Sequence, residues 1–377
     1  MNSRATRKHR PRGVPGALPA AALVLALAAC GQGAGAAAAR GTAGDTLPLA
    51  ERRAVAGTLA WVSERDGNPE VYVARPSGEG LRRLTSSPTA DYPAAPAPDG
   101  SGVLVVSVAE DSAMHLEQLA LYRLDGGAPR PIGPRMGRSR SPSWSPDGRW
   151  VVFESDEASF RDLYRIGADG RAPVRLTDDR LGNFEPAVSP DGGWIAFASS
   201  RDGNAELYVM RADGSEQRRL TAFHRDDWGA LWSPDGRTIA FLSNREGADR
   251  VYLVRPDGTG LRRLSTAAAD TGAAAGDVQE SEPAWSPDGK RLAYVRRTRD
   301  GESRIRVVEP ETGKVREVSD GRGRDGSPAW SPDGGYLAFT SDRDRDPELY
   351  LMRADGTGVT RLTRAPGADW LPRWLGR

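Results

Sequence analysis

The sequence predicts an all-β fold, a β-propeller of seven four-stranded blades, because two patterns repeat along the whole chain. A phrase of about 45 residues recurs seven times, and its clearest copy, from Trp194 to Thr221, reads WIAFASSRDGNAELYVMRADGSEQRRLT. A second landmark, Trp-Ser-Pro-Asp-Gly or a near relative, separates the copies, as at Trp144 to Gly148. Repeats of this period are typical of propellers and other repeat architectures, in which each unit buries its apolar face against its neighbours.

Each repeat is expected to contribute four strands. Three short runs of apolar, aromatic and β-branched residues are separated by turns rich in Gly and Asp, and a fourth run contains the landmark tryptophan. This alternation indicates strands, and no helical period is present. In the segment from Ser145 to Gly148, Pro presets the first central dihedral and Gly takes the left-handed conformation that leads into the next strand. Four antiparallel strands repeated radially form a propeller blade.

The two ends of the repeat region are out of phase. The first copy begins near Leu59 with a second strand, whereas the chain ends after the first strand around Trp374. We therefore expect the C-terminal strand to pair with the N-terminal blade and close the ring, which would hide the sheet edges. The seven copies begin near Leu59, Val103, Trp150, Trp194, Ile239, Leu292 and Leu337.

Residues 1–30 are expected to form an export signal, residues 31–56 a flexible tether and residues 57–377 the propeller. A basic start is followed by an apolar run from Ala17 to Ala29 that is too short to span a bilayer. The sequence Leu27-Ala28-Ala29-Cys30 resembles the bacterial lipoprotein signal, and Cys30 is the only cysteine. We expect Cys30 to be lipidated and the protein to be extracytoplasmic, anchored at the periplasmic face or at the cell surface. The alternative is a plain secretory signal.

Charge and composition argue against several classes of function. The whole chain has a net charge of +1, and removing the five basic residues of the signal leaves −4, which makes nucleic acid a poor partner. Only three histidines occur and no second cysteine, so no zinc site and no cofactor are expected. No nucleophile elbow or phosphate loop is present. We expect no catalytic residues and no enzymatic activity.

Acidic residues at alternate positions occur in three of the predicted hairpins. Oxygen ligands at this spacing suit calcium. Their recurrence at one position of the repeat favours a structural role in the hairpin, and no EF-hand glycine accompanies them. We therefore expect no metal site. The triplets are Asp66, Asn68 and Glu70; Asp202, Asn204 and Glu206; and Asp342, Asp344 and Asp346 with Glu348.

The loops that lead from the outermost strand of one blade to the first strand of the next are the expected binding region. The landmark tryptophans should pack blade against blade, whereas Trp228 and Trp370 lie outside that phase. Crossing loops on a rigid scaffold are common binding sites, and aromatic rings mixed with charges suit a protein or peptide contact. The candidate residues are Asp91, Tyr92, Arg140, Phe184, Glu185, Asp227, Trp228, Glu280, Glu282, Arg324, Asp325, Asp369 and Trp370.

The repeat resembles that of the TolB family, the propeller proteins of the Tol-Pal envelope system. The phrase Ile-Ala-Phe-x-Ser-x-Arg-Asp-Gly, the later Asp-Gly turn, Arg-Leu-Thr and Trp-Ser-Pro-Asp-Gly support this resemblance over about 320 residues. It implies a protein partner at the envelope. Three departures stand out: TolB has an α/β domain before its propeller, has six blades and is soluble. Prolyl oligopeptidases and oligogalacturonate lyases have similar repeats, but here a hydrolase domain and histidines are lacking.

Two functions remain open on the sequence. The first is a monomeric, non-enzymatic propeller at the envelope that binds a protein or peptide, such as a Tol-Pal-like partner, through the crossing loops, with only its lipid in the membrane. The alternative is a carbohydrate or small-molecule site, of lyase type, in the channel, using carboxylates such as Asp227, Glu280 and Glu282.

Overall fold

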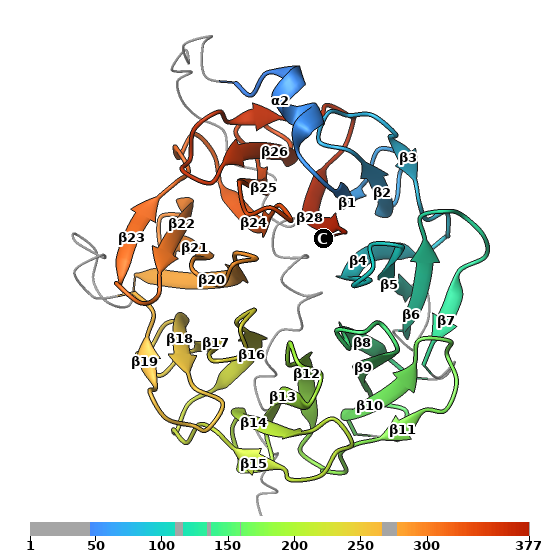
Figure 1. Cartoon of the computed structure of the whole chain (residues 1–377), viewed down its shortest axis with the longest axis vertical. Coiled ribbons are helices and arrows are strands. Elements are labelled where there is room, and N and C mark those ends of the chain that lie inside the picture. Colours follow the sequence, from blue (N-terminus) through green and yellow to red (C-terminus); the bar gives the residue numbers. More distant parts are fainter. Residues whose placement is uncertain (1–45, 110–115, 134–136, 159, 266–276, 377) are drawn as a thin grey trace, which may run out of the picture. The chain divides into compact units, whose positions relative to one another are not determined.

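A ring of seven antiparallel four-stranded sheets confirms the predicted propeller (Figure 1). The computed structural model describes residues 46–109, 116–133, 137–158, 160–265 and 277–376. We number the blades by their second strands along the chain. The first strand of each blade lies nearest the centre of the ring (Figure 1), and neighbours in sequence pair in the order first, second, third and fourth.

The first and second strands form the inner half of every blade. The first strands of blades 1 to 7 are β28 (Asp369–Leu375), β4 (Ala90–Pro96), β8 (Ser139–Trp144), β12 (Asn183–Val188), β16 (Asp227–Trp232), β20 (Val278–Trp285) and β24 (Asp325–Trp330). The second strands are β1 (Thr58–Ser63), β5 (Gly102–Ala109), β9 (Trp150–Ser155), β13 (Trp194–Ser199), β17 (Ile239–Ser243), β21 (Leu292–Thr298) and β25 (Tyr336–Ser341).

The third and fourth strands form the outer half. The third strands are β2 (Glu70–Ala74), β6 (Leu116–Arg123), β10 (Asp162–Gly167), β14 (Glu206–Arg211), β18 (Arg250–Val254), β22 (Ser303–Glu309) and β26 (Glu348–Arg353). The fourth strands are short and pair with the third strands over few residues. They are β3 (Arg82–Arg83), β7 (Arg130–Ile132), β11 (Val174–Arg175), β15 (Arg218–Arg219), β19 (Arg262–Arg263), β23 (Lys314–Glu317) and β27 (Thr360–Arg361).

Ring closure occurs as the phase of the repeat predicts. Strand β28 pairs antiparallel with β1, with Thr58 opposite Leu375 and Leu59 opposite Trp374. Blade 1 is thus made of both ends of the propeller. The Trp374 indole also donates a hydrogen bond of 3.0 Å to the carbonyl of Ala329 in blade 7.

The landmark tryptophans join neighbouring blades, as predicted. The indole of Trp232 donates a 3.0 Å hydrogen bond to the carbonyl of Ala187 in the preceding blade, and Trp330 does the same to Ala284 at 3.0 Å. The apolar core is accordingly divided into seven clusters of buried residues, each lying between two neighbouring blades. Burial of each cluster stabilises the contact between two neighbouring blades.

The Ser-Pro-Asp-Gly turns adopt the expected geometry. Ser145 Oγ donates a 2.6 Å hydrogen bond to Asp147, and the amide of Gly148 donates to the carbonyl of Ser145 at 2.9 Å. Gly148 has φ +68°, the left-handed region that glycine enters without a steric penalty. These turns and the turns between third and fourth strands lie on one face of the ring, which we call the turn face. The opposite face bears the second-to-third hairpins and the crossing loops, and we call it the loop face.

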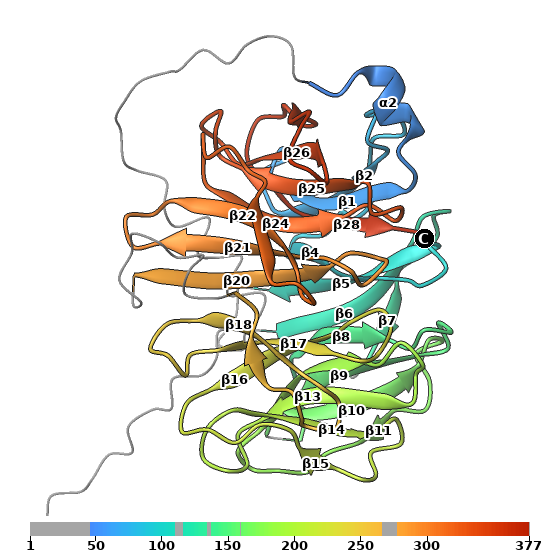
Figure 2. The same cartoon turned by 60° about the vertical axis from the view of Figure 1, so that its left-hand side comes forward.

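Part of the predicted tether is ordered against the propeller. Within 31–56, helix α2 (Leu49–Ala54) lies at the outer edge of blades 7 and 1 (Figure 1), on the side toward which β28 runs (Figure 2). Leu47 and Val55 at its ends are buried in the core between these blades, and this burial explains the order. The predicted signal with Cys30 lies outside the described residues. No helix in the described part of the chain has the length and apolarity that crossing a bilayer requires.

Candidate functional site

The candidate binding residues lie in the first strands rather than in crossing loops. All but Arg324 lie within β4, β8, β12, β16, β20, β24 or β28. Asp227 already pairs with Ser243, and Asp369 pairs with Ser63, so the ladder begins at the positions expected to be loop. The expectation of loop residues was therefore wrong. Each first strand contains a bulge that interrupts the ladder locally, and pairing resumes on the N-terminal side of the bulge, at the positions expected to be loop.

Burial divides the candidates into three groups. The carboxyl groups of Asp91, Asp227, Glu280, Asp325 and Asp369 are fully or almost fully buried, as are Arg140, Phe184 and Trp370. Tyr92, Glu185, Trp228 and Glu282 are half-buried, and Arg324 is exposed. Arg324 donates to Asp342 at 2.6 Å. Only the last two groups can touch a partner in this conformation.

The buried aspartates hold the second-to-third hairpins in place. Asp227 accepts a 2.7 Å hydrogen bond from Arg245, whose Nε donates to Ser243 at 2.9 Å. The same arrangement joins Asp325 to Arg343 at 3.0 Å and Asp369 to Arg65 at 3.1 Å. Burial raises the pKa of Asp227 and of Asp325, while the arginine and nearby serine hydroxyls oppose that rise. The arginine pairs give these aspartates a role in the fold, although among the described residues Asp227 Oδ1 and Asp325 Oδ2 are buried without a hydrogen-bond partner.

In blades 1, 3, 4 and 7, a second carboxylate, at the start of the third strand, holds the beginning of the crossing loop. In blade 4, Glu206 is fully buried and accepts hydrogen bonds from Arg219 at 2.8 Å, Thr221 at 2.7 Å and the amide of Phe223 at 2.6 Å. Glu70 and Glu348 make equivalent contacts in blades 1 and 7. These bonds account for the acidic triplets as parts of the hairpins. Within the described residues, no three His, Cys, Asp or Glu side chains come together to hold a metal.

Blade 5 departs from this arrangement, and the departure explains Glu280. Arg250 stands where blades 1, 3, 4 and 7 have a carboxylate, and its guanidinium donates to the carbonyl of Val278. Glu280, from the first strand of blade 6, supplies the missing acceptor: it receives the amide of Val251 at 2.9 Å and the hydroxyl of Ser265. Glu280 is therefore a structural group of blade 5 and is not available to a ligand.

A ring of bulged residues surrounds the channel. Six first strands have a residue with positive φ at the same position, where the ladder shifts register: Ser141, Glu185, Gly229, Glu282, Ser327 and Leu371. We call these six residues the bulge ring. Their glutamates reach the next blade, since Glu185 accepts the amide of Gly229 at 2.9 Å and Glu282 accepts the amide of Ser327. Bulges of this kind re-aim side chains, and here they direct the two glutamates to the backbone of the next blade.

The carboxyl group of Glu185, in the bulge ring, has a strongly shifted pKa. Burial raises its pKa to about 7, and the negative charge of Glu154 adds to the rise. Glu154 is itself buried and receives Arg140 at 2.6 Å, and Arg140 also pairs with Glu117 at 3.0 Å. Burial also lowers the pKa of Arg161 and of Arg373. Several charged groups of the inner strands and of the blade 3 hairpin are thus held at low solvation, at a cost in folding free energy.

The raised pKa of Glu185 predicts a pH dependence of stability. The folded state retains a proton that the unfolded state, with a pKa near 4.5, releases as pH rises. The stabilisation is present below pH 4.5 and is lost as the pH rises through about 7. Between pH 5 and 8 this group should lower the free energy of unfolding by about 2 kcal/mol. Glu185→Gln should remove that part of the slope in urea denaturation, and parallel pH profiles for the two proteins would contradict this assignment.

Sequence reasoning missed an apolar set on the loop face. Phe160, in the β9–β10 hairpin, is 44% exposed, Leu181, in the β11–β12 loop, is 59% exposed, and Phe223, in the β15–β16 loop, is 37% exposed. The first two segments are joined by a hydrogen bond of 2.7 Å from the amide of Asn183 to the carbonyl of Arg161. Phe160 takes the repeat position at which other hairpins have Asn68 and Asn204. That break in the repeat was the available signal.

Two family models match consecutive parts of the chain. The N-terminal β-propeller domain of Tricorn protease matches residues 158–278, and the TolB β-propeller domain matches residues 279–376. The chain is similar to the TolB β-propeller domain over its last blades. A TolB homolog of Chlorobaculum tepidum is 31% identical to it over 130 residues, which are 34% of this chain and 29% of that protein. An uncharacterized protein of Agrobacterium fabrum is 31% identical over 118 residues, and this match spans 39% of its length.

Solved structures share the fold of this TolB-like propeller. TolB from Acinetobacter baumannii aligns with a TM-score of 0.53 at 20% identity, covering 85% of this chain and 67% of that one. An oligogalacturonate lyase in complex with manganese aligns with a TM-score of 0.60 at 18% identity, covering 82% and 86%. Enzymes and a TolB protein thus share this architecture, and the fold alone does not distinguish their functions.

Proposed function

We propose that this TolB-like propeller is a non-enzymatic protein of the cell envelope that binds a protein or peptide partner through its loop face. The observation that supports the proposal is the set of exposed apolar side chains, Phe160, Leu181 and Phe223, on that face. Apolar residues in a polar surround are the usual core of a protein interface. Half-buried Tyr92 and Trp228 lie toward the centre of the same face, and Arg324 adds a charge at its rim.

The rigidity of the ring favours this role. The hairpins and crossing loops that present the apolar set are held by the buried Asp-Arg and Glu-Arg pairs, so little conformational entropy is lost when a partner binds. The alternative of a sugar or small molecule in the channel gains no support from the carboxylates predicted for it. Asp227 and Glu280 are buried in hydrogen bonds, and Glu282 accepts a backbone amide.

The apolar set gives a direct test of partner binding. In Phe160→Ser/Leu181→Ser/Phe223→Ser, the yield of a crosslinked partner complex in the native envelope should fall about tenfold or more, because buried apolar anchors supply much of the free energy of binding. Each product would be quantified by mass spectrometry after crosslinking the mature protein.

A matched control changes three exposed apolar residues that lie on the other side of the ring. Leu81, Val174 and Leu261 are 52%, 52% and 43% exposed and belong to third-to-fourth hairpins or fourth strands. Leu81→Ser/Val174→Ser/Leu261→Ser should retain the complex. Equal loss in both triple variants, or none in the loop-face variant, would place the partner elsewhere.

The proposal includes a lipid anchor at Cys30, which rests on the sequence alone. A basic start, an apolar run and a single cysteine after Leu27-Ala28-Ala29 support it. In Cys30→Ala, the protein should move from the membrane pellet to the soluble fraction after cell lysis, because no acyl chains remain to hold it. The fraction in each compartment can be measured by immunoblotting. Unchanged partitioning would contradict the anchor.

A further inference from the structure

The turn face has grooves at repeat-equivalent places between blades, and one of them holds a peptide segment of this chain. Between blades 7 and 1, the amide of Leu47 donates a 2.6 Å hydrogen bond to Thr360. Leu47 packs so closely on Gly358 that a Cβ there would lie 2.7 Å from its Cδ2. The carboxylate of Glu51 accepts hydrogen bonds from Arg353 at 2.8 and 2.7 Å and from the Tyr336 hydroxyl at 3.0 Å. This groove therefore shows how a blade boundary binds a peptide with an acidic side chain.

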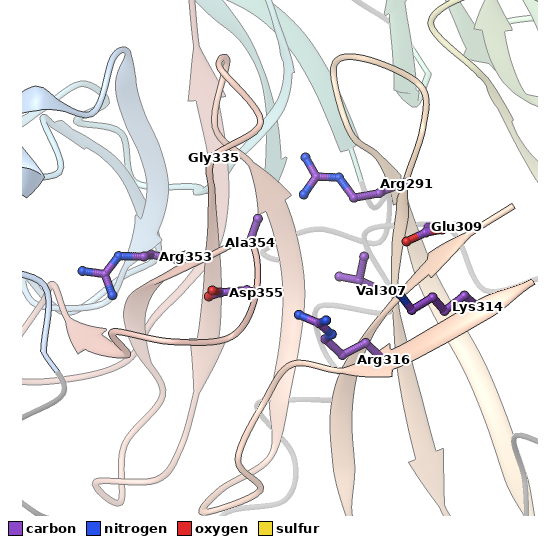
Figure 3. A pocket seen from close by; sticks show the side chains of 9 residues that line it. All are labelled: Arg291, Val307, Glu309, Lys314, Arg316, Gly335, Arg353, Ala354 and Asp355. Atoms are coloured by element: carbon purple, nitrogen blue, oxygen red, sulfur yellow. The ribbon is translucent and has the colours of Figure 1, made fainter. Parts of the chain in front are cut away.

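The groove between blades 6 and 7 is one repeat earlier and contains a cavity of 410 Å³. Strand register gives the equivalent residues: Arg291 stands in place of Tyr336, Lys314 in place of Gly358 and Arg316 in place of Thr360. Figure 3 shows the side chains of Arg291, Lys314 and Arg316 extending from blade 6 toward Ala354 and Asp355 of blade 7. Three cationic side chains thus face the space that a peptide fills in the neighbouring groove.

Arg316 differs from the arginines at its position in other blades. Arg218 donates a 2.5 Å hydrogen bond to the carbonyl of Pro256 in the next blade, and Arg262 donates a 2.6 Å bond to Pro310. Arg82 makes the same kind of bond to Leu124. These arginines therefore link neighbouring blades by hydrogen bonds. Within the described residues, the side chain of Arg316 forms no hydrogen bond or ion pair. Its guanidinium lines the cavity.

The ammonium of Lys314 likewise has no hydrogen bond or ion pair within the described part of the chain. It is exposed and stands opposite Glu309 on the neighbouring strand, yet no ion pair forms between them. Arg291 is positioned by a 2.9 Å hydrogen bond to the carbonyl of Gly334. The acids of the groove are Glu309 and Asp355, and Arg353 is neutralised by Glu51. The groove therefore has a surplus of positive charge.

The equivalent groove between blades 4 and 5 has the opposite character. Its cavity of 540 Å³ is lined by Asp191, Asp235 and Asp257, with Arg218 as its single cation. Arg218 is already bonded to Pro256, and its guanidinium lies 5.6 Å from the ring of Trp194. The positive charge of the groove between blades 6 and 7 therefore does not follow from the repeat.

We propose that the groove between blades 6 and 7 binds an acidic peptide segment of a partner protein. Lys314 and Arg316 are two residues apart on one strand, so they point to the same side about 7 Å from each other. An extended peptide with acidic residues at alternate positions matches this spacing, and Arg316 can hold a carboxylate through two parallel hydrogen bonds. The inference is independent of the loop face, which lies on the opposite side of the ring.

The test is a fluorescence-polarisation titration with a labelled peptide, Leu-Pro-Leu-Glu-Ala-Glu-Ala-Glu, and its counterpart with Gln in place of every Glu. The acidic peptide should bind the mature protein, and the Gln peptide should bind about tenfold more weakly or not at all. Lys314→Glu/Arg316→Glu should weaken binding of the acidic peptide about tenfold or more, since it replaces attraction with repulsion. Both residues are exposed, so circular dichroism and the melting temperature should be unchanged.

Arg171→Glu/Arg180→Glu is the matched control, because it makes the same change in net charge at exposed arginines in blade 3 and the loop that follows it. It should leave the affinity unaltered, as should the loop-face variant Phe160→Ser/Leu181→Ser/Phe223→Ser. The proposal is overturned if Lys314→Glu/Arg316→Glu binds as the wild type does, if the control loses the same affinity, or if both peptides bind equally. If only the groove variant loses affinity, the groove proposal is supported even when the loop face binds no partner.

Discussion

Replacing Trp374 with alanine should lower the free energy of unfolding by about 3 to 5 kcal/mol, the usual cost of deleting a large buried aromatic side chain. Trp374 is 8% exposed, packs in the core between blades 7 and 1 and donates its indole proton to Ala329. It lies in β28, the strand that closes the ring. The substitution therefore weakens the only blade whose strands come from both ends of the propeller.

Trp194 provides the comparison for this measurement. It is half-buried in the groove between blades 4 and 5, where Arg211 lies 4.4 Å above its ring. Trp194→Ala should cost about half as much or less, because less apolar surface is lost. Urea denaturation gives both values. In Trp374→Ala, hydrogen exchange should also quicken at the β1 amides. Similar losses in the two variants would mean that closure by β28 contributes no special stability.

Replacing Glu206 with alanine should destabilise the protein by about 3 to 5 kcal/mol as well. This carboxylate is fully buried and satisfies Arg219, Thr221 and the amide of Phe223. Removing it leaves the Thr221 hydroxyl, the Phe223 amide and the Asn204 amide group without this acceptor, at about 1–3 kcal/mol for each buried group. Arg219, whose side chain is 34% exposed, retains a 2.9 Å hydrogen bond to Asp202. The melting temperature and the urea midpoint should both fall.

Two variants separate the loss of the buried pair from a general effect of charge. Glu206→Gln retains an acceptor oxygen and should lose less than Glu206→Ala. Asp125→Ala breaks an exposed pair with Arg123, with an N to O distance of 2.7 Å and side chains 63% and 47% exposed, and should change stability far less than Glu206→Ala. If Asp125→Ala proved as costly as Glu206→Ala, burial would not be the reason for the effect.

The fold could be predicted because every local signal in the repeat agreed with every other. The Ser-Pro-Asp-Gly turns marked the first hairpin of each blade, and the phase difference between Leu59 and Trp374 implied a shared blade. Both features are local in the sequence and depend on turn geometry and on period, which are general properties of chains. The seven-bladed count and the closure by β28 followed from them.

The candidate site was harder to predict because its groups are defined by distant partners. From the sequence, Asp227 is expected to be an exposed acid in a polar stretch. In the structure it is buried and accepts a hydrogen bond from Arg245, eighteen residues further on. The bulges that draw these residues into strands depend on positive φ at positions such as Glu185, which has no turn residue to announce it. Segment 46–56 gave no sign of docking, since its contacts are with Thr360 and Arg353, more than three hundred residues away. Phe160, by contrast, broke the repeat visibly in the sequence.

The replacement of the third-strand carboxylate by Arg250 bears on how such a chain can change over generations. Blades of this kind look interchangeable, and repeat proteins grow and shrink by duplicating or losing single units. Blade 5, however, takes its carboxylate from Glu280 of blade 6. A copy of blade 5 inserted elsewhere would lack the acceptor for the Val251 amide, and a deletion of blade 6 would remove it from the parent. Blades 5 and 6 can therefore be gained, lost or transplanted only as a pair.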